Sequence, residues 1–181
     1  MKAKGLERYL NSFGKQVVRD SRELLQSAKG STALGSSIRF EVVPTATGFD
    51  TKFYMDDYGT YLDKGVSGNK TKQSYINTKQ KKIISPYSYT TKGPPIDILS
   101  KWIKKKGIKG HGIKKGRSKN TGQYISGFAY LISRKIKREG IKSISFFQVP
   151  LGIGYRKLEK HTLEVLKLDI QNYITTYYRP K

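Results

Sequence analysis

The chain has 181 residues, of which 36% are hydrophobic, and carries 36 Lys and Arg against 13 Asp and Glu, a net charge of +23. A chain of this length can bury one sizeable core, and its charge favours a polyanionic or acidic partner. The lack of cysteine excludes disulfides, thiol nucleophiles and thiolate metal sites.

The N-terminal third of the chain predicts a helix followed by two paired strands. Apolar residues recur at helical spacing over residues 4–29, and Gly30 is a suitable stop. Residues 36–44 and 48–55 alternate apolar and other side chains around a turn, which is typical of paired strands. Residues 56–65 predict either a short helix or a distorted strand. The side chains expected to face inward from the helix are Leu6, Leu10, Phe13, Val17, Leu24 and Ala28.

The middle of the chain predicts two long basic loops around a short helix. Residues 66–93 are polar and rich in turn formers, and loops of that length are usually functional or disordered. The pair Pro94-Pro95 is suited to open a helix that Gly107 ends. A second polar loop is expected over residues 107–121.

Two further helices are expected toward the C-terminus. Apolar residues at helical spacing predict the first over residues 121–139, with Gly140 as its stop. Residues 141–158 contain Pro150 and two glycines, so a strand or turn is expected there. The last helix is expected to run from about Leu158 to Tyr177. The inward side chains expected on this last helix are Leu163, Leu166, Ile170, Ile174 and Tyr177.

These elements predict a single α+β domain over residues 1–181, with an N-terminal helix, a small antiparallel sheet and two or three further helices. The first thirteen residues lack the apolar run of a signal peptide, and no stretch approaches the roughly 20 apolar residues of a membrane span. We therefore expect a protein made in the cytosol, without a membrane partner.

The titratable residues do not predict an enzyme. His111 and His161 lie fifty residues apart without clustered carboxylates, and neither has the spacing of a metal motif. The scattered acids offer one alternative, a metal-dependent nuclease site formed by Asp56, Asp57 and Asp63. Ordinary surface positions account for these residues better. We expect no catalytic residue, no cofactor, no metal and no small-molecule substrate.

The positive charge is concentrated in one segment. Between Lys64 and Lys119 there are sixteen Lys or Arg and a single acid, so this segment carries +15 and the other 125 residues carry +8. A solvated surface is the plainer interpretation, but self-repulsion of this size destabilises a compact state unless a partner offsets it. Basic loops bind phosphates without reading sequence. We expect contact with DNA, or with an acidic partner, at Lys104, Lys105, Lys106, Lys109, Lys114, Lys115, Arg117 and Lys119.

Three stretches of sequence show a common order of motifs: YGTYLDKGVSGNK, then SPYSYTTKGPPIDILSKWIKKKGI, then FAYLISRKIKREGIKSISFFQVPL. A Tyr-rich segment ends in a GxSG turn, a Pro pair opens a Lys-rich helix, and a helix of the form A..I.R.I...GI leads to FF..P. This order resembles the small neck or tail-completion proteins of tailed bacteriophages over roughly residues 1–177. The run GIGYRKL after Pro150 departs from the family's plainer helical run. The matching positions are Tyr61, Gly65, Gly68, Pro94, Pro95, Trp102, Ala129, Ile132, Arg134, Ile136, Gly140, Ile141, Phe146, Phe147 and Pro150.

The resemblance implies a structural virion protein without enzymatic activity. Its expected form is a homo-oligomeric ring of twelve or six copies in the neck, assembled in the host bacterial cytoplasm. Portal, adaptor or tail proteins are its expected partners, with genomic double-stranded DNA in its channel. A soluble protein that binds nucleic acid without sequence specificity is the alternative. Aromatic side chains expected at the assembly interface are Tyr75, Tyr87, Tyr89, Phe146 and Phe147.

Overall fold

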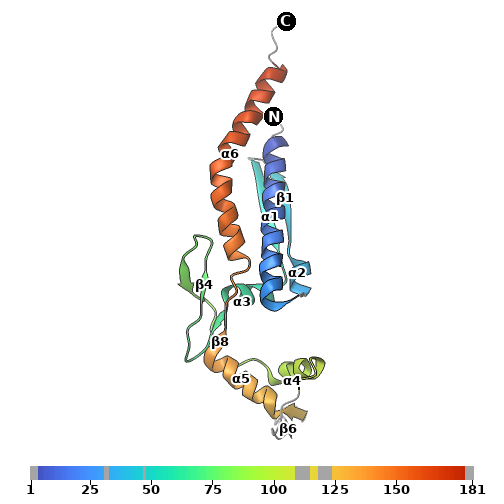
Figure 1. Ribbon diagram of the computed structural model, residues 1–181, viewed down its shortest axis with the longest axis vertical. Coiled ribbons are helices and arrows are strands. Elements are labelled where there is room, and N and C mark those ends of the chain that lie inside the picture. Colours follow the sequence, from blue (N-terminus) through green and yellow to red (C-terminus); the bar gives the residue numbers. More distant parts are fainter. Residues whose placement is uncertain (1–3, 31–32, 47, 109–114, 118–123, 178–181) are drawn as a thin grey trace. The chain divides into compact units, whose positions relative to one another are not determined.

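The structure, a computed structural model, describes residues 4–30, 33–46, 48–108, 115–117 and 124–177 (Figure 1). Helices and two-stranded sheets alternate along these residues, which confirms the predicted α+β class. The chain divides into two compact units. Unit 1 comprises residues 1–63, 76–82 and 144–181, and unit 2 comprises residues 64–75 and 83–143. The sequence predicted one domain, whereas each of the two units has buried residues of its own.

Unit 1 begins with the predicted helix, α1 (Lys4–Lys29). The helix ends where predicted, because Gly30 adopts φ +75° and its N–H bonds the Gln26 carbonyl at 2.7 Å. Its buried face follows the predicted positions at first and then shifts by one residue, so that Leu25 is buried and Leu24 is exposed. The buried residues of α1 are Leu10, Phe13, Gly14, Val17, Val18, Ser21 and Leu25.

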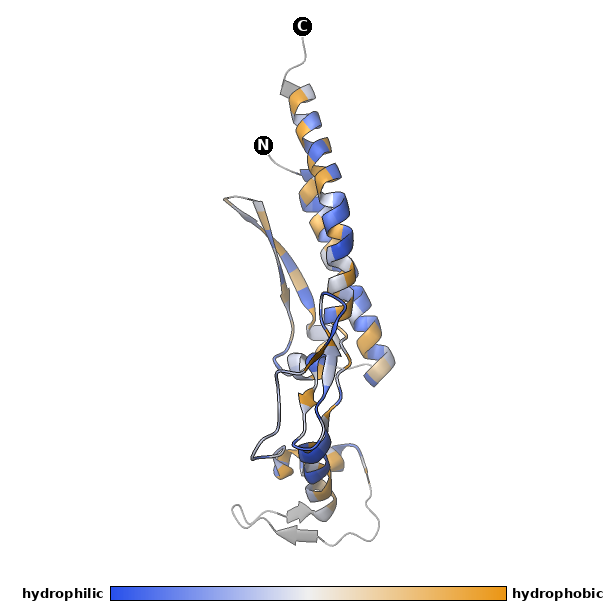
Figure 2. Cartoon of the chain, turned by 90° about the vertical axis from the view of Figure 1, so that its left-hand side faces the viewer, coloured by the Kyte–Doolittle hydropathy of each residue, from blue (hydrophilic) through white to orange (hydrophobic). Residues whose placement is uncertain are grey.

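A short helix, α2 (Ala33–Ser37), leads into the predicted hairpin of β1 (Arg39–Thr45) and β2 (Gly48–Tyr54). The strands pair antiparallel, with Phe40 opposite Phe53. Hydrophilic and hydrophobic residues alternate along both strands (Figure 2), so one face of the hairpin is apolar. That face packs against α1, where Gly14 leaves room for the ring of Phe40.

The core of unit 1 joins α1, the hairpin and the C-terminal helix, α6 (Gln148–Tyr177). The ring of Phe53 lies 6.0 Å from that of Phe13 and 5.5 Å from that of Phe147, both edge-on. Because α6 runs antiparallel beside α1 (Figure 1), residues from the two ends of the chain share one core. Its fully buried members are Val17, Leu25, Leu34, Ile38 and Phe146.

The start of α6 is held by a buried carboxylate. The ambiguous segment after β2 forms a helix, α3 (Tyr58–Lys64), and places Asp63 with 1% of its surface exposed. Its Oδ1 accepts the N–H groups of Phe147 at 2.8 Å and Gln148 at 3.3 Å. The first N–H groups of a helix have no partner within the helix, and a carboxylate there also meets the positive end of the helix dipole. Asp63 is therefore the N-terminal cap of α6.

The predicted strand or turn over residues 141–158 is wrong for most of its length, because α6 already begins at Gln148. Pro150 is tolerated since it lies in the first turn, where its missing N–H costs no helical hydrogen bond. The two glycines serve close packing inside unit 1. A Cβ at Gly152 would lie 2.1 Å from the Thr78 carbonyl oxygen, and one at Gly154 would lie 2.6 Å from the Phe13 ring.

The far half of α6 differs in part from the expectation, because Leu166 is half-buried while three other residues expected to face inward are exposed. Leu163, Ile170 and Ile174 are 74%, 42% and 50% exposed. One polar contact nevertheless joins this half to α1: the carboxylate of Asp169 accepts the N–H groups of Gly5 and Leu6 at 3.0 and 2.9 Å. It thus caps the start of α1 from another helix.

Unit 2 is built around two helices, α4 (Ile96–Lys105) and α5 (Gly127–Glu139), with Ile103 and Ala129 buried. Gly107 and Gly140 end these helices with φ +64° and +82°, as predicted. The predicted loop 66–93 contains short strands: β3 (Val66–Ser67), β4 (Ser74–Ile76) and β5 (Lys82–Ile84). β3 pairs with β8 (Gly140–Ile141), and β4 pairs with β5. None of the described helices has the length and apolarity that crossing a membrane requires.

Replacing Asp63 by Ala should lower the free energy of unfolding by about 3 kcal/mol, because the buried N–H of Phe147 and the partly buried N–H of Gln148 lose a charged acceptor. Urea denaturation followed by circular dichroism measures this loss. Asp50→Ala is the matched control, since Asp50 is exposed on β2 and should change stability by less than about 0.5 kcal/mol. Equal stability of the two variants would show that Asp63 does not cap α6.

Gly152→Ala should destabilise the protein, although Ala is the better helix former by about 1 kcal/mol. The added methyl meets a backbone carbonyl that cannot move aside cheaply, and overpacking of this kind costs about 1–3 kcal/mol beyond the gain in propensity. Thermal unfolding compares this variant with Lys160→Ala, an exposed change on the same helix. A rise in melting temperature for Gly152→Ala would contradict the close packing at this position.

Candidate nucleic-acid interface

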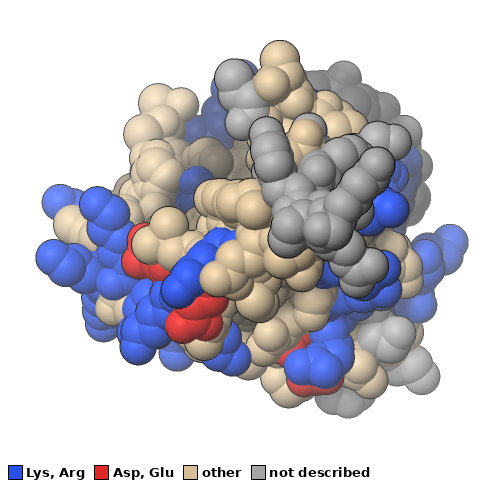
Figure 3. Space-filling model, turned by 90° about the horizontal axis from the view of Figure 1, so that it is seen from above, with Lys and Arg blue, Asp and Glu red and all other residues tan. Residues whose placement is uncertain are grey.

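Most of the positive charge of the chain belongs to unit 2. Its residues include eighteen Lys and Arg against two acids, Asp97 and Glu139, a net +16 of the total +23. Lys and Arg also outnumber Asp and Glu over the chain as a whole, and Figure 3 shows this excess on the face seen from above, at the end of the molecule where both termini lie. A surface with such an excess attracts polyanions at ordinary salt.

The helix α4 presents part of this charge. Pro95 precedes its first residue with φ −57° and ψ 126°, and Asp97 lies in its first turn. At the other end, the N–H groups of Lys106, Gly107 and Ile108 satisfy carbonyls of the last turn at 3.0–3.2 Å. Hydrogen bonds thus cap the C-terminal end of α4, whereas its N-terminal end has no side-chain cap.

Lys104, Lys105 and Lys106 lie at the end of α4 with exposed side chains. Cations there stabilise the helix through its dipole, typically by about 0.3–1 kcal/mol, which gives them a structural role as well. No acidic side chain of the described residues forms an ion pair with any of the three. They are free to meet phosphates or carboxylates of a partner.

A stripe along α4 adds apolar surface to these cations. Ile98, Lys101, Trp102 and Lys105 follow helical spacing along one exposed side, with Ile98 64% and Trp102 45% exposed. Such a stripe offers ammonium groups for phosphates and an indole that can stack on a base or pack on a protein. Sequence reasoning singled out neither Ile98 nor Lys101, although their spacing from Lys105 was an available signal.

The predicted basic loop over residues 107–121 is in part a strand pair. Lys115 and Arg117 belong to β6 (Lys115–Arg117), which pairs antiparallel with β7 (Tyr124–Ser126). Backbone hydrogen bonds of a ladder form whatever the charge of the side chains. Three further predicted contact residues, Lys109, Lys114 and Lys119, lie outside the described residues, as does His111.

Three of the five aromatic residues expected at an assembly interface are core residues. Phe146, Phe147 and Tyr75 are 0%, 9% and 9% exposed. The expectation is wrong for these three, because a side chain enclosed by its own chain offers no contact surface to a neighbour. The FF..P motif instead fills the core immediately before α6.

Tyr87 and Tyr89 are half-buried in unit 2. The backbone of Ser67 links them, since its N–H bonds the Tyr87 carbonyl and its carbonyl accepts the Tyr89 N–H, each at 2.8 Å. Burial raises the pKa of Tyr89 above its ordinary value, so the phenol stays neutral at physiological pH. Both rings keep part of their surface exposed and remain candidates for a partner contact.

The acids of the nuclease alternative do not converge. Asp63 is used as the cap of α6, while the side chains of Asp56 and Asp57 are exposed. Across the described ranges, no three His, Asp or Glu residues are grouped as a metal ion would require. His161 lies on the exposed side of α6, with Nδ1 3.2 Å from a Glu164 oxygen. These positions favour structural and surface roles for all four residues.

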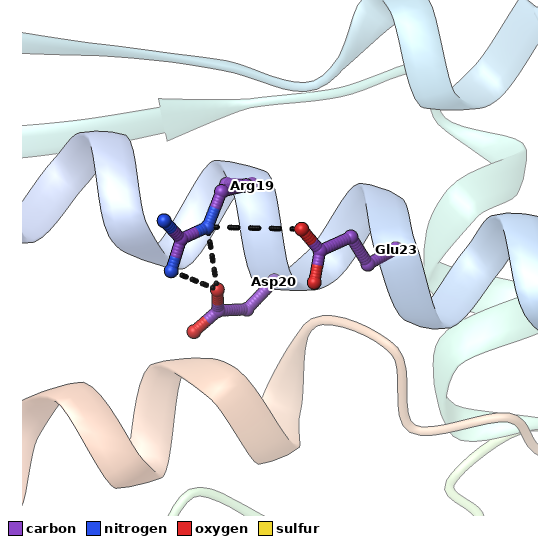
Figure 4. Close-up of polar contacts among 3 residues, drawn as sticks. All are labelled: Arg19, Asp20 and Glu23. Atoms are coloured by element: carbon purple, nitrogen blue, oxygen red, sulfur yellow. Dashed lines mark hydrogen bonds and ion pairs between the residues drawn. The ribbon is translucent and has the colours of Figure 1, made fainter.

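Unit 1 holds eleven of the thirteen acids of the chain, so its eighteen Lys and Arg leave a net charge of only +7. On α1, the guanidinium of Arg19 lies 3.1 Å from Asp20 and 3.7 Å from Glu23 (Figure 4). Exposed pairs of this kind contribute little to stability, but they neutralise the cation locally. The strongest field for a polyanion is therefore expected on unit 2.

Comparison with protein-family models, with curated proteins and with solved structures gives no match. Functional inference for this chain accordingly depends on its own residues and on the motif resemblance described above.

Replacing Lys104, Lys105 and Lys106 together by Gln should weaken binding to a DNA duplex. Each lost phosphate contact removes about 0.9 from the slope of log K against log salt, so the slope should fall by roughly 2 to 3. Fluorescence anisotropy over a salt series measures it. The control replaces the exposed Lys52, Lys157 and Lys160 of unit 1 by Gln. An equal fall in both variants would mean that the end of α4 has no special role.

Proposed function

We propose that this chain is a structural subunit of the head-to-tail connector of a tailed bacteriophage. Copies of the chain form a ring in the virion neck, between the portal and the tail, and genomic DNA passes through the lumen. The ring has twelve or six copies and is assembled in the bacterial cytoplasm. It performs no chemical reaction.

One observation carries this proposal: the charge of the chain is divided unevenly between the two units, with +16 on unit 2 and +7 on unit 1. A connector subunit needs one part that meets DNA and another that meets protein. The cationic, acid-poor unit 2 suits the first task. Unit 1, with exposed apolar residues on α6, suits the second.

Ring assembly also accounts for how modest individual sites can act together. Subunits that contact one another head to tail close into a ring if the rotation allows it. Many copies of one basic surface then face a single DNA molecule, and linked sites raise the effective concentration for one another. A single subunit therefore does not need a high affinity for DNA.

The alternative is a free protein that binds nucleic acid without sequence preference, which the same charge distribution favours. The two functions differ in what the isolated chain does. A free binding protein acts as a monomer with tight, salt-dependent affinity, whereas a connector subunit requires neighbours and recognises portal or tail proteins.

Cryo-electron microscopy of the particles of a phage that encodes this protein should show a ring of its density at the portal vertex. Residues 104–106 should face the lumen, because the DNA is the largest polyanion there. Native mass spectrometry with purified portal or tail protein should show a complex. Absence of the chain from the particle, with no affinity for either protein, would overturn the connector function and leave the free binding protein.

A further inference from the structure

Unit 2 contains a cleft that none of the expected site residues lines. It has a volume of about 910 Å³, within the range of sites that hold small ligands or ligand segments. One wall is α5, the opposite wall is the loop that follows β3, and α4 contributes its first residue. The described residues that line it are Asn69, Lys70, Ile96, Tyr130, Leu131, Ser133, Arg134, Lys135, Lys137 and Arg138.

Five of these ten side chains are cationic and none is acidic. Four of the cations come from α5 and the fifth, Lys70, comes from the opposite wall. The loop is fixed there, because the N–H groups of Asn69 and Lys70 bond the carbonyls of Lys137 and Arg138 at 2.9 and 3.0 Å. These bonds satisfy carbonyls of the last turn of α5 and hold Lys70 near that helix.

Three of the cations have structural contacts of their own. The guanidinium of Arg138 lies 2.6 Å from Glu139, which also lies 4.0 Å from Lys135. The Nζ of Lys137 donates to the Thr91 carbonyl at 2.7 Å. The pKa of Glu139 is lowered, chiefly by the hydrogen bond from Arg138; burial opposes this shift, and the positive charges of Lys135 and Arg138 add to it. The surroundings of the cleft therefore favour negative charge.

The two remaining cations, Lys70 and Arg134, are exposed and form no ion pair with an acid of the described residues. The guanidinium of Arg134 lies over the ring of Tyr130, 5.8 Å from its centroid. Stacking of this kind restricts the side chain and leaves the donors at its edge free. A planar guanidinium with free donors is suited to bind two oxygens of one phosphate, and an ammonium group adds a point charge.

We propose that this cleft binds a phosphate group of the DNA backbone, with Arg134 and Lys70 as its direct ligands. The inference rests on the proposed function, in which DNA passes beside unit 2, and it adds a contact apart from the end of α4. Ile96 and Leu131 supply apolar surface for the neighbouring sugar. Recognition is through the backbone alone, so it is independent of base sequence.

The test uses the full chain with Lys70 and Arg134 both replaced by Gln, and a duplex of about 24 base pairs at several salt concentrations. Loss of the one phosphate that both side chains bind should lower the slope of log K against log salt by about 0.9. The control replaces Lys157 and Lys160 of α6 by Gln and should leave the slope unchanged. Both pairs of positions are exposed, and circular dichroism verifies that the variants fold.

The variant Arg134→Lys distinguishes the effect of guanidinium geometry from that of positive charge, because it keeps the charge and changes the geometry. It should keep the salt slope of the wild type but weaken binding about three- to ten-fold, because an ammonium cannot hold two oxygens at once. Inorganic pyrophosphate, followed through the Arg134 Nε–H signal in NMR, tests free phosphate as the ligand. A shift with duplex supports the proposal, whereas a shift with pyrophosphate and none with duplex overturns the DNA backbone as its source.

Two further outcomes would overturn the proposal that the cleft binds a DNA phosphate. One is an equal fall in slope for the Gln pair and its control, and the other is a wild type that binds poly-glutamate but no duplex. Neither decides the connector function, which is judged by the presence of the ring in the particle. Conversely, suppose that the salt slope falls for the variant with Lys70 and Arg134 replaced while the protein is absent from phage particles. That result would support phosphate binding in the cleft and overturn the connector function.

Discussion

The bond between the Asp63 carboxylate and the start of α6 is the constraint on which most of unit 1 depends. A buried charge is costly unless it is hydrogen-bonded, and the first turn of α6 supplies the donors. With that turn fixed, Phe146 and Phe147 enter the core and Gly152 and Gly154 meet their neighbours closely. One acid thus supplies the acceptor at the point where a thirty-residue helix begins.

The two units differ in how far acids compensate their positive charge. Unit 1 holds eleven of the thirteen acids, uses Asp63 to cap α6 and Asp169 to cap α1, and pairs two others with Arg19. Unit 2 leaves most of its cations without acids and has few large buried side chains to offset their repulsion. A phosphate-rich partner would lower that repulsion, so binding and the stability of unit 2 are linked. The proposed connector provides such a partner.

Much of the secondary structure could be predicted from the sequence, because local signals decide it. Gly30, Gly107 and Gly140 end helices as expected, and alternation identified the hairpin. The prediction of a break in the helix was wrong at Gly152. In the sequence, a glycine that ends a helix cannot be distinguished from one that makes room for a carbonyl of a distant residue, here Thr78. The cap at Asp63 and the cleft at Arg134 could not be predicted for the same reason: each depends on residues distant in sequence. The concentration of positive charge in the sequence indicated the part of the chain that forms the candidate interface, but not which of its residues line the cleft.

The cap that Asp169 provides for α1 bears on the order in which the chain can fold. The N–H groups of Gly5 and Leu6 find their acceptor more than 160 residues later in the sequence. During synthesis the first helix therefore leaves the ribosome long before its partner exists, while the residues of unit 2 emerge in between. Contacts of such separation slow folding because the intervening chain must be closed into a loop first. Unit 1 can reach its final packing only after Asp169 has been synthesised, and until then the apolar face of α1 depends on chaperones or on the β1–β2 hairpin for cover.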